Sequence, residues 1–385
     1  MASDRRALKV VQAKAMAREL SLDTRRRSAP VQRFSESLSE KVVGQQGAIT
    51  AILDSFSRVI AGIRDRERPI LTLLFLGPTG VGKTETVKAL AETIFGKRDA
   101  FVRINCQEFN NEGAINKLFG SPPGYVGADV EPLLSQEQLD RHHRSAQEER
   151  RGVFADGSGR IAKLFPESDE HFLSVICFDE VEKAHPTVWS ALLGLMDDGH
   201  ITLGSNQRVD CTRSIIVMTS NVGADAMSTT LQDRRVGFDL MDEGADQLNA
   251  EVSKQAVEAA KQHFPYEFFN RFDDIICFRA LARADLRRIL GRMLQDIYKR
   301  LMDAGVPIIL HPSVALKNWL IDRGYDPQFG ARPLRRVVEG ELVAPLSRLI
   351  ATEQIRPGQV IGMGLRGGRP RFWVETGHGS DQLLV

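Results

Sequence analysis

The sequence predicts an α/β protein, with a parallel sheet covered by helices on both faces and then a smaller, mainly helical domain. The length of 385 residues corresponds to two or three domains, at roughly 100 to 200 residues each. Strand-like apolar runs alternate with helical stretches between about residues 38 and 280, which is typical of a parallel sheet. From residue 281 the pattern becomes helical, which indicates the second domain.

Five short apolar runs make up the predicted sheet. They span residues 70–76, 101–105, 172–178, 214–219 and 274–278. Residues 128–171 interrupt the alternation with a polar, charge-dense stretch, which we interpret as a chain-specific insertion formed by a surface helix and a flexible loop. The core domain therefore covers residues 38–280. The second domain covers 281–375, closes with a strand-like pair around 360–375, and leaves 376–385 as a flexible tail.

The net charge of +1 hides an uneven distribution. Residues 1–33 contain nine basic and three acidic residues, a net charge of +6, which leaves −5 for the remainder. We expect residues 1–37 to form a short basic amphipathic helix that Pro30 ends, followed by a linker. An Arg-rich transit peptide is the alternative, although the three acids weigh against it. The near-neutral total disfavours nucleic acid or an anionic membrane as the main partner.

Several other classes of protein are excluded by composition. The longest apolar run, residues 70–76, is far shorter than the roughly 20 residues that span a bilayer. No segment has the charged, apolar and small-residue parts of a signal peptide in order, so we do not expect export. The four cysteines form no CxxC motif, which disfavours disulfides or a zinc site and favours the cytoplasm. His142 and His143 lie in a polar stretch, where a solvated face is the better interpretation than a metal site.

A glycine-rich motif follows the first strand-like run. The residues after Leu76 read G-P-T-G-V-G-K-T, and a helical stretch follows, which is the context of a phosphate-binding loop. Glycines let backbone N–H groups surround phosphate oxygens where side chains would clash. Lys83 supplies a positive charge, and the Thr84 hydroxyl suits Mg²⁺. The motif predicts binding of a nucleoside triphosphate by Gly77, Pro78, Thr79, Gly80, Val81, Gly82, Lys83 and Thr84.

Two acids end a later strand-like run. Asp179 and Glu180 lie directly after the apolar residues 174–178. A nucleoside triphosphatase needs a carboxylate for its metal ion and a group that activates the attacking water. We expect Asp179 to bind Mg²⁺ and Glu180 to act as the general base. Strand ends are commonly acidic, so this pair alone would be a weak signal. The phosphate loop, with Lys83 96 residues before Asp179, is what favours the catalytic interpretation.

Seven motifs in order give the chain a family resemblance. Residues 38–375 resemble the second ATPase module of the Clp family of AAA+ protein unfoldases and disaggregases. The resemblance implies an ATPase core with a helical lid, ATP and Mg²⁺ as cofactors, assembly of identical subunits into a six-membered ring, and protein substrates. The matching stretches are VVGQ at 42–45, FLGPTGVGKTE at 75–85, GSPPGYVG at 120–127, FDEVEKAHP at 178–186, MTSN at 218–221, FFNRFDDI at 268–275 and GYDPQFGARPLRR at 324–336.

The resemblance also implies roles for single residues. Asn221 resembles the first sensor, which positions the attacking water, and Arg332 resembles the second sensor, which reaches the phosphates from the lid. Arg271 resembles the arginine finger that enters the neighbouring subunit's site. Val42 and Val43 lie where the family packs the adenine base. Taken alone, Asn221 fits a turn residue at a strand end better, and Arg271 and Arg332 fit surface salt bridges better; the motifs around them reverse this. Val42 and Val43 equally fit ordinary core.

The motif Gly124-Tyr125-Val126-Gly127 suggests the work that ATP drives. In the family this loop lines the central pore, and its aromatic residue grips an unfolded polypeptide. Tyr125 offers apolar area with little entropy to lose, while the flanking glycines permit unusual backbone conformations. The resemblance makes Tyr125 and Val126 the expected substrate contacts. A buried tyrosine beside a Pro-Pro turn is the alternative.

Three departures from the family pattern qualify the resemblance. About 37 residues precede the matching module, so the usual N-terminal route of substrate or adaptor choice is not expected. The pore motif continues as GADVEPLL instead of a glycine-rich acidic stretch, and the interval before Asp179 is expanded. Val236, Gly237 and Phe238 resemble the tripeptide with which some members dock a barrel-shaped peptidase, but three residues also fit a loop anchor.

The sequence thus predicts an ATP-hydrolysing, ring-forming remodeller that pulls polypeptide through a central pore. The alternative is a nucleotide-gated assembly or scaffold protein that controls a partner without threading it. The 128–171 segment and the missing family domains favour this alternative, whereas the pore motif favours threading.

Overall fold

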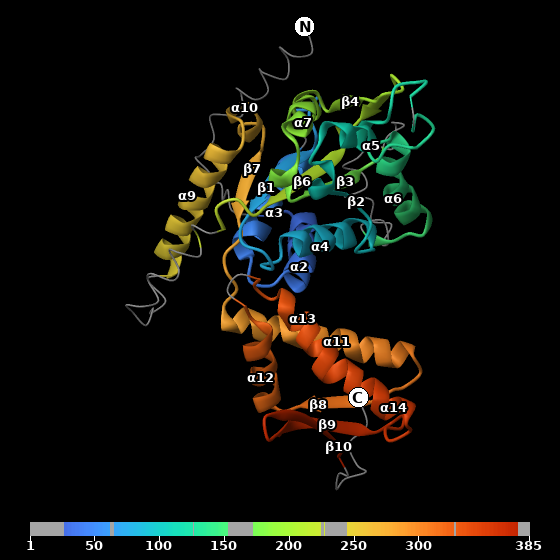
Figure 1. The fold of residues 1–385 in the computed structure, drawn as a ribbon, viewed down its shortest axis with the longest axis vertical. Coiled ribbons are helices and arrows are strands. Elements are labelled where there is room, and N and C mark those ends of the chain that lie inside the picture. The colour runs from blue at the N-terminus through green and yellow to red at the C-terminus, as the bar shows by residue number, and fades with distance from the viewer. Residues whose placement is uncertain are drawn as a thin grey trace, which may run out of the picture.

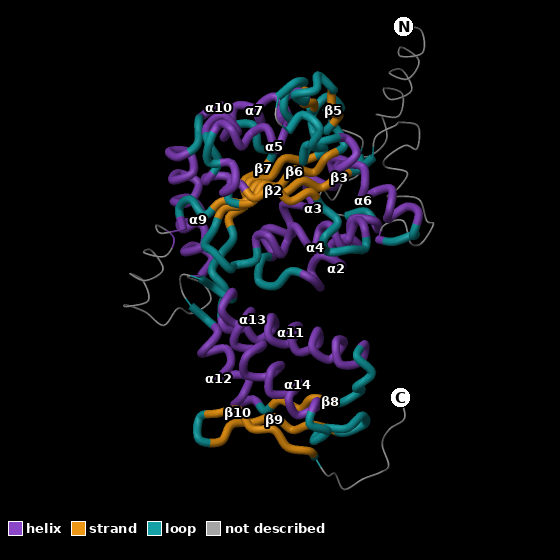
Figure 2. The backbone as a smooth tube through the Cα atoms, turned by 45° about the vertical axis from the view of Figure 1, so that its right-hand side comes forward, coloured by secondary structure: helices purple, strands orange, loops and turns teal. Residues whose placement is uncertain are grey.

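The chain folds into two lobes that follow one another along the long axis of the molecule (Figure 1). The computed structural model describes residues 27–61, 65–125, 127–152, 172–224, 227, 245–326 and 329–375. The first lobe holds the large sheet, and the second, from residue 281, holds a small sheet covered by helices (Figure 2). Each lobe has its own buried core.

A five-stranded parallel sheet forms the centre of the first lobe. Its order is β2-β3-β6-β1-β7, and every neighbouring pair is parallel. The five predicted runs are confirmed as β1 (Leu71–Leu76), β2 (Val102–Asn105), β3 (Ser174–Asp179), β6 (Ser214–Ser220) and β7 (Asp274–Cys277). A small antiparallel hairpin was not expected; it consists of β4 (His200–Thr202) and β5 (Arg208–Asp210).

Helices cover both faces of the large sheet, as the alternating pattern predicts (Figures 1 and 2). The strands bury side chains on both faces: Leu73 belongs to one core cluster and its neighbour Leu74 to the other. The first face packs on α2 (Ala29–Lys41), α3 (Gln46–Ile60) and α4 (Lys83–Phe95). The second packs on α7 (Pro186–Asp198), α9 (Ala245–His263) and α10 (Tyr266–Phe269), while the short α5 (Asn116–Phe119) precedes the motif with Tyr125.

Helix α2 corrects the expected linker. It runs through Pro30, which lies in its first turn, where the missing N–H removes no helical hydrogen bond. Phe34 is buried and stacks on Phe56 of α3 with ring centroids 4.5 Å apart. Residues 29–37 therefore belong to the core lobe. The predicted basic helix before them falls in residues 1–26, outside the described part.

Helix α6 (Gln136–Glu148) lies in the segment expected to be an insertion. The expected helix forms, but one of its faces is buried beside β3. The expected solvated position is wrong for His143, which is buried and whose Nδ1 accepts the Leu173 N–H at 3.1 Å. Asp140 accepts the Phe172 N–H at 3.3 Å, so the helix holds the chain that enters β3. Residues 153–171 lie outside the described part.

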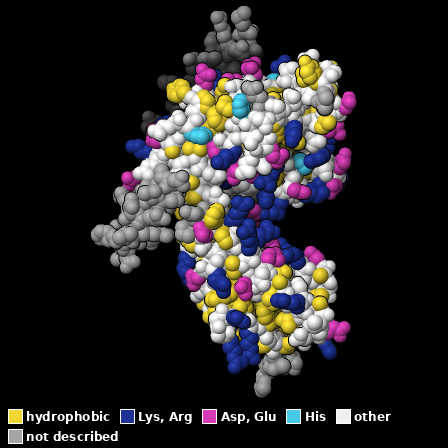
Figure 3. All heavy atoms as spheres, in the orientation of Figure 1, with side chains coloured by type: hydrophobic (Ala, Val, Ile, Leu, Met, Phe, Trp, Pro, Cys, Tyr) yellow, Lys and Arg dark blue, Asp and Glu magenta, His cyan; other side chains and the backbone are white. Residues whose placement is uncertain are grey.

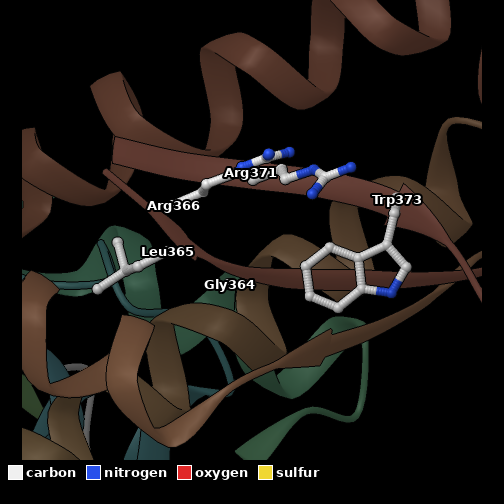
Figure 4. Close-up of a pocket in the computed structure, with 5 residues that line it drawn as sticks. All are labelled: Gly364, Leu365, Arg366, Arg371 and Trp373. Atoms are coloured by element: carbon white, nitrogen blue, oxygen red, sulfur yellow. The ribbon is translucent and has the colours of Figure 1, made fainter. Parts of the chain in front are cut away.

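The second lobe is mainly helical with one small sheet. The expected strand pair is confirmed as an antiparallel pair, and an additional strand, β8, runs parallel to β9. A Cβ on Gly362 would lie 2.2 Å from the Trp373 ring. One on Gly364 would lie 3.1 Å from it, so the indole covers this part of β9 (Figure 4). The elements are α11 (Arg283–Asp303), β8 (Ile309–Pro312), α12 (Val314–Gly324), α13 (Arg332–Val338), a π-helical turn (Glu339–Val343), α14 (Ala344–Ala351), β9 (Val360–Arg366) and β10 (Arg369–Val374).

The two lobes carry opposite charge. Residues 281–375 contain sixteen basic and nine acidic residues, a net charge of +7, whereas residues 34–280 contain 26 basic and 37 acidic residues, a net charge of −11. On the face shown in Figure 3, Lys and Arg side chains gather where the lobes meet and on the second lobe. Within the described residues, no helix combines the length and apolar character that a membrane crossing requires.

Candidate nucleotide-binding site

The phosphate loop connects β1 to α4 in a conformation that only glycine can adopt. Gly77 and Gly80 have φ values of +149° and +77°. A Cβ on Gly77 would lie 2.7 Å from the Phe278 carbonyl oxygen, and one on Gly80 would lie 2.0 Å from that of Phe329. Because α4 begins directly after the loop, its free N–H groups and positive end face the same space. This arrangement is a ready anion site.

Lys83 is buried at the start of α4. Its Nζ donates to the Pro78 carbonyl at 2.9 Å, to the Gly77 carbonyl, and to Asn221 Oδ1 at 2.9 Å. Burial lowers the pKa of Lys83 to about 8, although nearby carboxylates oppose the shift, with Glu182 the strongest. A buried ammonium held by neutral carbonyls is only partly compensated, so phosphate oxygens would be strong competing acceptors.

Asp179 ends β3 with both carboxylate oxygens engaged. Oδ1 accepts the Thr219 hydroxyl at 2.7 Å and the Thr84 hydroxyl at 3.2 Å, and Oδ2 pairs with Arg103 at 2.5 Å. Burial alone would raise the pKa of Asp179, but these hydrogen bonds and the Arg103 charge outweigh it and lower the pKa. Asp179 is therefore an anion at neutral pH.

Glu180 follows Asp179 in a left-handed backbone conformation, with φ +59°. A non-glycine residue there is uncommon and strained, and such strain concentrates at functional sites. The Glu180 N–H donates to the Thr219 hydroxyl at 3.0 Å, and the Gln107 amide donates to the Glu180 carboxylate. The turn thereby directs the two neighbouring carboxylates of residues 179 and 180 to different partners.

Asn221 follows β6, which lies between β1 and β3, and it links Lys83 to Glu182. Its Oδ1 accepts from Lys83, and its backbone N–H and Nδ2 donate to Glu182 Oε1 at 3.1 and 3.3 Å. The other Glu182 oxygen is buried and has no hydrogen-bond partner in the described part of the chain. The carboxyl ends of three parallel strands thus bring Lys83, Asp179 and Asn221 together.

The VVGQ segment lies beside the phosphate loop. Val42 and Val43 are buried, which fits either an adenine contact or core. Gln45 is also buried; its amide donates to the Val81 carbonyl at 3.1 Å and the Arg279 carbonyl at 2.9 Å, and its oxygen accepts the Arg279 N–H at 3.2 Å. Gln45 therefore ties the phosphate loop to the connection between the lobes.

The second lobe contacts the phosphate loop through its backbone. The Ala331 N–H donates to the Gly80 carbonyl at 3.2 Å, and Arg332 begins α13 immediately afterwards. The Arg332 side chain is exposed, and its backbone nitrogen would lie 3.3 Å from a Cβ on Gly80. The structure therefore places Arg332 next to the nucleotide loop, at the junction of the lobes.

Arg271 lies at the opposite end of the sheet. The Asp273 N–H, two residues further on, donates to the Thr72 carbonyl near the start of β1, whereas the phosphate loop leaves the other end of that strand. Six strand residues separate these ends by about 20 Å. The Arg271 side chain is 44% exposed and pairs with Asp197, so the fold does not bring it to the site of its own chain.

The loop with Tyr125 presents its side chain to solvent. Tyr125 is 71% exposed between Gly124 and Gly127, whose φ values are +89° and +88°. The alternative of a buried tyrosine is therefore wrong. Val126 and the tripeptide Val236–Phe238 lie outside the described residues.

Sequence reasoning missed several polar partners at the site. They are Gln45, Arg103, Gln107, Glu182 and Thr219. Arg103 and Thr219 lie inside predicted apolar strands, Gln107 and Glu182 lie within four residues after one, and Gln45 is the last residue of the VVGQ segment. Two shallow cavities of about 590 and 450 Å³ lie elsewhere, in the second lobe, and are lined by none of these residues (Figure 4).

Two family models match the chain. One described as AAA domain (Cdc48 subfamily) matches residues 68–146 and 152–275, more than half of the chain. One described as the C-terminal, D2-small domain of ClpB protein matches residues 281–363. The boundary between these matches coincides with the boundary between the lobes.

Relatives of known identity are larger than this chain. The ATP-dependent Clp protease ATP-binding subunit ClpC of Staphylococcus saprophyticus is 39% identical over 318 residues, which cover 82% of this chain and 34% of ClpC. ClpC of Staphylococcus aureus has the same identity and coverage. The chain thus spans about a third of the length of these curated relatives.

Solved structures give the same assignment. The closed state of Hsp104 with ATPyS and FITC casein has a TM-score of 0.67 at 28% identity and covers 89% of this chain and 51% of that one. The S. cerevisiae Hsp104:casein complex in its extended conformation has a TM-score of 0.70 at 28% identity, covering 91% and 53%. Together with the strand order and the phosphate loop, these matches show that the chain belongs to the Clp family of AAA+ proteins.

Proposed function

We propose that this chain hydrolyses ATP and uses the energy to pull polypeptide through the pore of a ring of identical subunits. The observation that carries the proposal is the separation of the site into two parts. Lys83, Asp179 and Asn221 converge at one end of the sheet, while Arg271 lies at the other. A site that needs Arg271 is completed by a neighbouring copy.

The nucleotide would bind between the phosphate loop and the second lobe. Its phosphates would accept from the loop N–H groups and Lys83, and its base would pack near Val42 and Val43. The Thr84 hydroxyl and the Asp179 carboxylate lie 3.2 Å apart, and such hard oxygen donors fit Mg²⁺. The bound ion would neutralise charge that develops on the phosphates.

Hydrolysis would use the residues around the loop in separate roles. Glu180 would accept the proton of the attacking water, and Asn221 would orient that water from the end of β6. Arg332 would reach the phosphates from the second lobe, so that nucleotide binding and lobe position depend on one another. Arg271 would act on the phosphates bound by the neighbouring subunit of a homohexamer.

The polypeptide would be gripped by the loop that carries Tyr125 and Val126. Exposure of Tyr125 supports this role, because its ring is available to a partner instead of to the core. The relatives support this role, because the Hsp104 structures are complexes with casein and ClpC is the ATP-binding subunit of a protease. We further propose that this work takes place in the cytoplasm, and we keep Val236, Gly237 and Phe238 as the candidate peptidase contact.

The proposal is tested with Tyr125→Ala in two assays on the full chain. ATP hydrolysis should stay within about threefold of wild type, whereas ATP-dependent unfolding of a fluorescent model protein should fall at least tenfold, because the grip is lost and the nucleotide site is intact. Lys83→Ala is the control that should lose both activities. Unfolding that survives Tyr125→Ala would contradict the grip by Tyr125, whereas a wild-type chain that hydrolyses ATP without unfolding the model protein would favour the nucleotide-gated scaffold.

A further inference from the structure

The side chain of Arg271 is held in place by one carboxylate. Arg271 Nε lies 2.7 Å from Oδ1 of Asp197, in the last turn of α7. This contact uses the nitrogen nearest the chain and leaves the two terminal Nη groups of the guanidinium without a recorded partner in the described residues. A guanidinium bound in this way still presents two parallel donors, the geometry that suits a phosphate.

The position of Asp197 is unfavourable for its own helix. The C-terminal end of a helix carries partial negative charge, so basic residues are preferred there. Helix α7 instead ends with Asp197 and Asp198 and has no basic residue in its last turn. Acidic residues at a helix C-terminus go against this preference. Such a departure, when another part of the fold compensates for it, is typical of a functional position. Arg271 supplies the compensation for Asp197, whereas the exposed Asp198 side chain has no hydrogen-bond or ion-pair partner among the described residues.

The backbone of Arg271 is fixed as well. Arg68 donates through Nη2 to the Arg271 carbonyl at 3.1 Å and through Nε to the Met196 carbonyl, also at 3.1 Å. One side chain therefore joins the residue before Asp197 to Arg271 itself. Next to Arg271, the ring of Phe272 packs edge-on against buried Phe268, with centroids 5.3 Å apart. Both ends of the Arg271–Asp197 pair are thus anchored to the core.

We infer that Asp197 is a positioning residue for Arg271, orienting its terminal Nη groups outward for the phosphate of a neighbouring copy. The inference rests on the proposed role of Arg271 in trans. A displacement of about 1 Å in such a group can cost on the order of 10²-fold in rate. Asp197 holds the guanidinium at a fixed angle before the neighbour arrives, so no ordering is needed during the reaction.

The test compares three single variants of the full chain in steady-state ATP hydrolysis. Asp197→Ala should lower kcat about 10- to 100-fold and leave KM and nucleotide affinity near wild type, because each chain's own pocket is untouched. Asp197→Asn keeps an oxygen that can accept from Nε and should recover most of kcat. Asp198→Ala removes an equivalent charge from the same helix end and should be close to wild type. Equal losses in Asp197→Ala and Asp198→Ala would overturn the inference, as would wild-type kcat in Asp197→Ala.

A double-mutant cycle separates this inference from the proposed function. If Asp197 acts only through Arg271, adding Asp197→Ala to Arg271→Ala should cause no further loss. If Arg271→Ala alone keeps full turnover, the finger assignment fails and the inference fails with it. If Arg271→Ala is inactive while Asp197→Ala is fully active, the finger stands and only the positioning role is wrong.

Discussion

Lys83 is the residue whose environment has the most direct chemical consequence. Its ammonium is buried among carbonyl groups, and burial lowers its pKa to about 8. A bound phosphate would stabilise the charged form and raise the pKa of this group again. Nucleotide binding is therefore expected to take up a proton when the pH is above the pKa of the free protein.

This linkage predicts a pH-dependent affinity. Below about pH 8 Lys83 is already protonated, so the Kd for nucleotide should be flat. Above it, the Kd should rise by up to tenfold per pH unit, because the neutral amine must be protonated before it can pair with phosphate. Titration of a fluorescent nucleotide between pH 7 and 9.5 measures this. Lys83→Ala should bind weakly with no such slope, and a flat Kd in the wild type would refute the linkage.

At the residue scale, the sequence predicted the groups with a chemical signature and missed their partners. The glycines, Lys83 and the acids of the predicted site follow from the chemistry of phosphate and metal binding. Arg103 and Gln45 carry no such signature, because their roles depend on which distant segments the fold brings together. Arg103 reaches Asp179 only because β2 pairs with β3. The roles of Asn221 and Arg332 rested on family resemblance, since an amide or a guanidinium alone fits many positions.

Among the elements, α6 shows how a polar sequence can still be structural. Four of its side chains are buried although the stretch consists mostly of polar and charged residues. Two of them, Asp140 and His143, accept backbone N–H groups at the entry to β3. Burial lowers the pKa of His143 to about 4, with a further contribution from Arg213. The helix therefore depends on a neutral imidazole.

The consequence is a loss of stability in mild acid. The unfolded chain protonates this histidine near pH 6.5 and the folded chain near pH 4, so the unfolded state binds more protons between these values. The free energy of unfolding should fall with decreasing pH by at most about 1.4 kcal/mol per unit from this group. His143→Gln should flatten the fall in urea titrations, and His263→Gln, at an exposed site, should not. An unchanged slope in His143→Gln would contradict the assignment.

The elements that sequence patterns predicted are the long or strongly apolar ones. The five core strands are apolar runs buried on both faces, which is why their periodicity was informative. Strand β8 has only four residues, one of them Pro312. It forms because it pairs with β9, about 50 residues later in the chain, which no local pattern predicts. The pattern predicts a linker where α2 begins, because a proline commonly ends a helix, whereas Pro30 lies in the first turn of this one.

For the whole molecule, the proposed role of Arg271 implies that a single chain holds two separate parts of a site. The pocket with Lys83 and the exposed Arg271 lie at opposite ends of one sheet. Head-to-tail contacts between identical copies can close into a ring, and each contact would join one half-site to the other.

Mixing variants tests this arrangement. Lys83→Ala removes the pocket and keeps Arg271, while Arg271→Ala does the opposite, so each alone should be nearly inactive. In an equal, random mixture half of the copies have an intact pocket, and half of their neighbours have an intact Arg271. About a quarter of the sites would therefore combine both, and ATP hydrolysis should partly return. Mixing each variant with wild-type protein gives the reference activity for such mixed assemblies. If the mixture is no more active than its components, Arg271 does not act between copies.

The overall charge is a poor guide to this molecule, because the +1 total combines −11 for residues 34–280, +7 for residues 281–375, +6 for residues 1–33 and −1 for residues 376–385. Only the lobe boundary, which the change to helical pattern predicted near residue 281, makes the asymmetry visible. Salt should therefore weaken any contact that joins the second lobe of one copy to the core of another.

The placement of the tryptophans provides an optical reporter. Trp189 is buried in the core lobe, whereas Trp373 lies over β9 and is 42% exposed. Trp319, also in the second lobe, has the Arg323 guanidinium 4.8 Å from its ring. A collisional quencher in solution reaches the exposed indole first, so quenching of intrinsic fluorescence monitors the surface of the small sheet. Trp373 thus serves as an intrinsic fluorescent probe of the second lobe, and the shielded Trp189 in the first lobe serves as the reference.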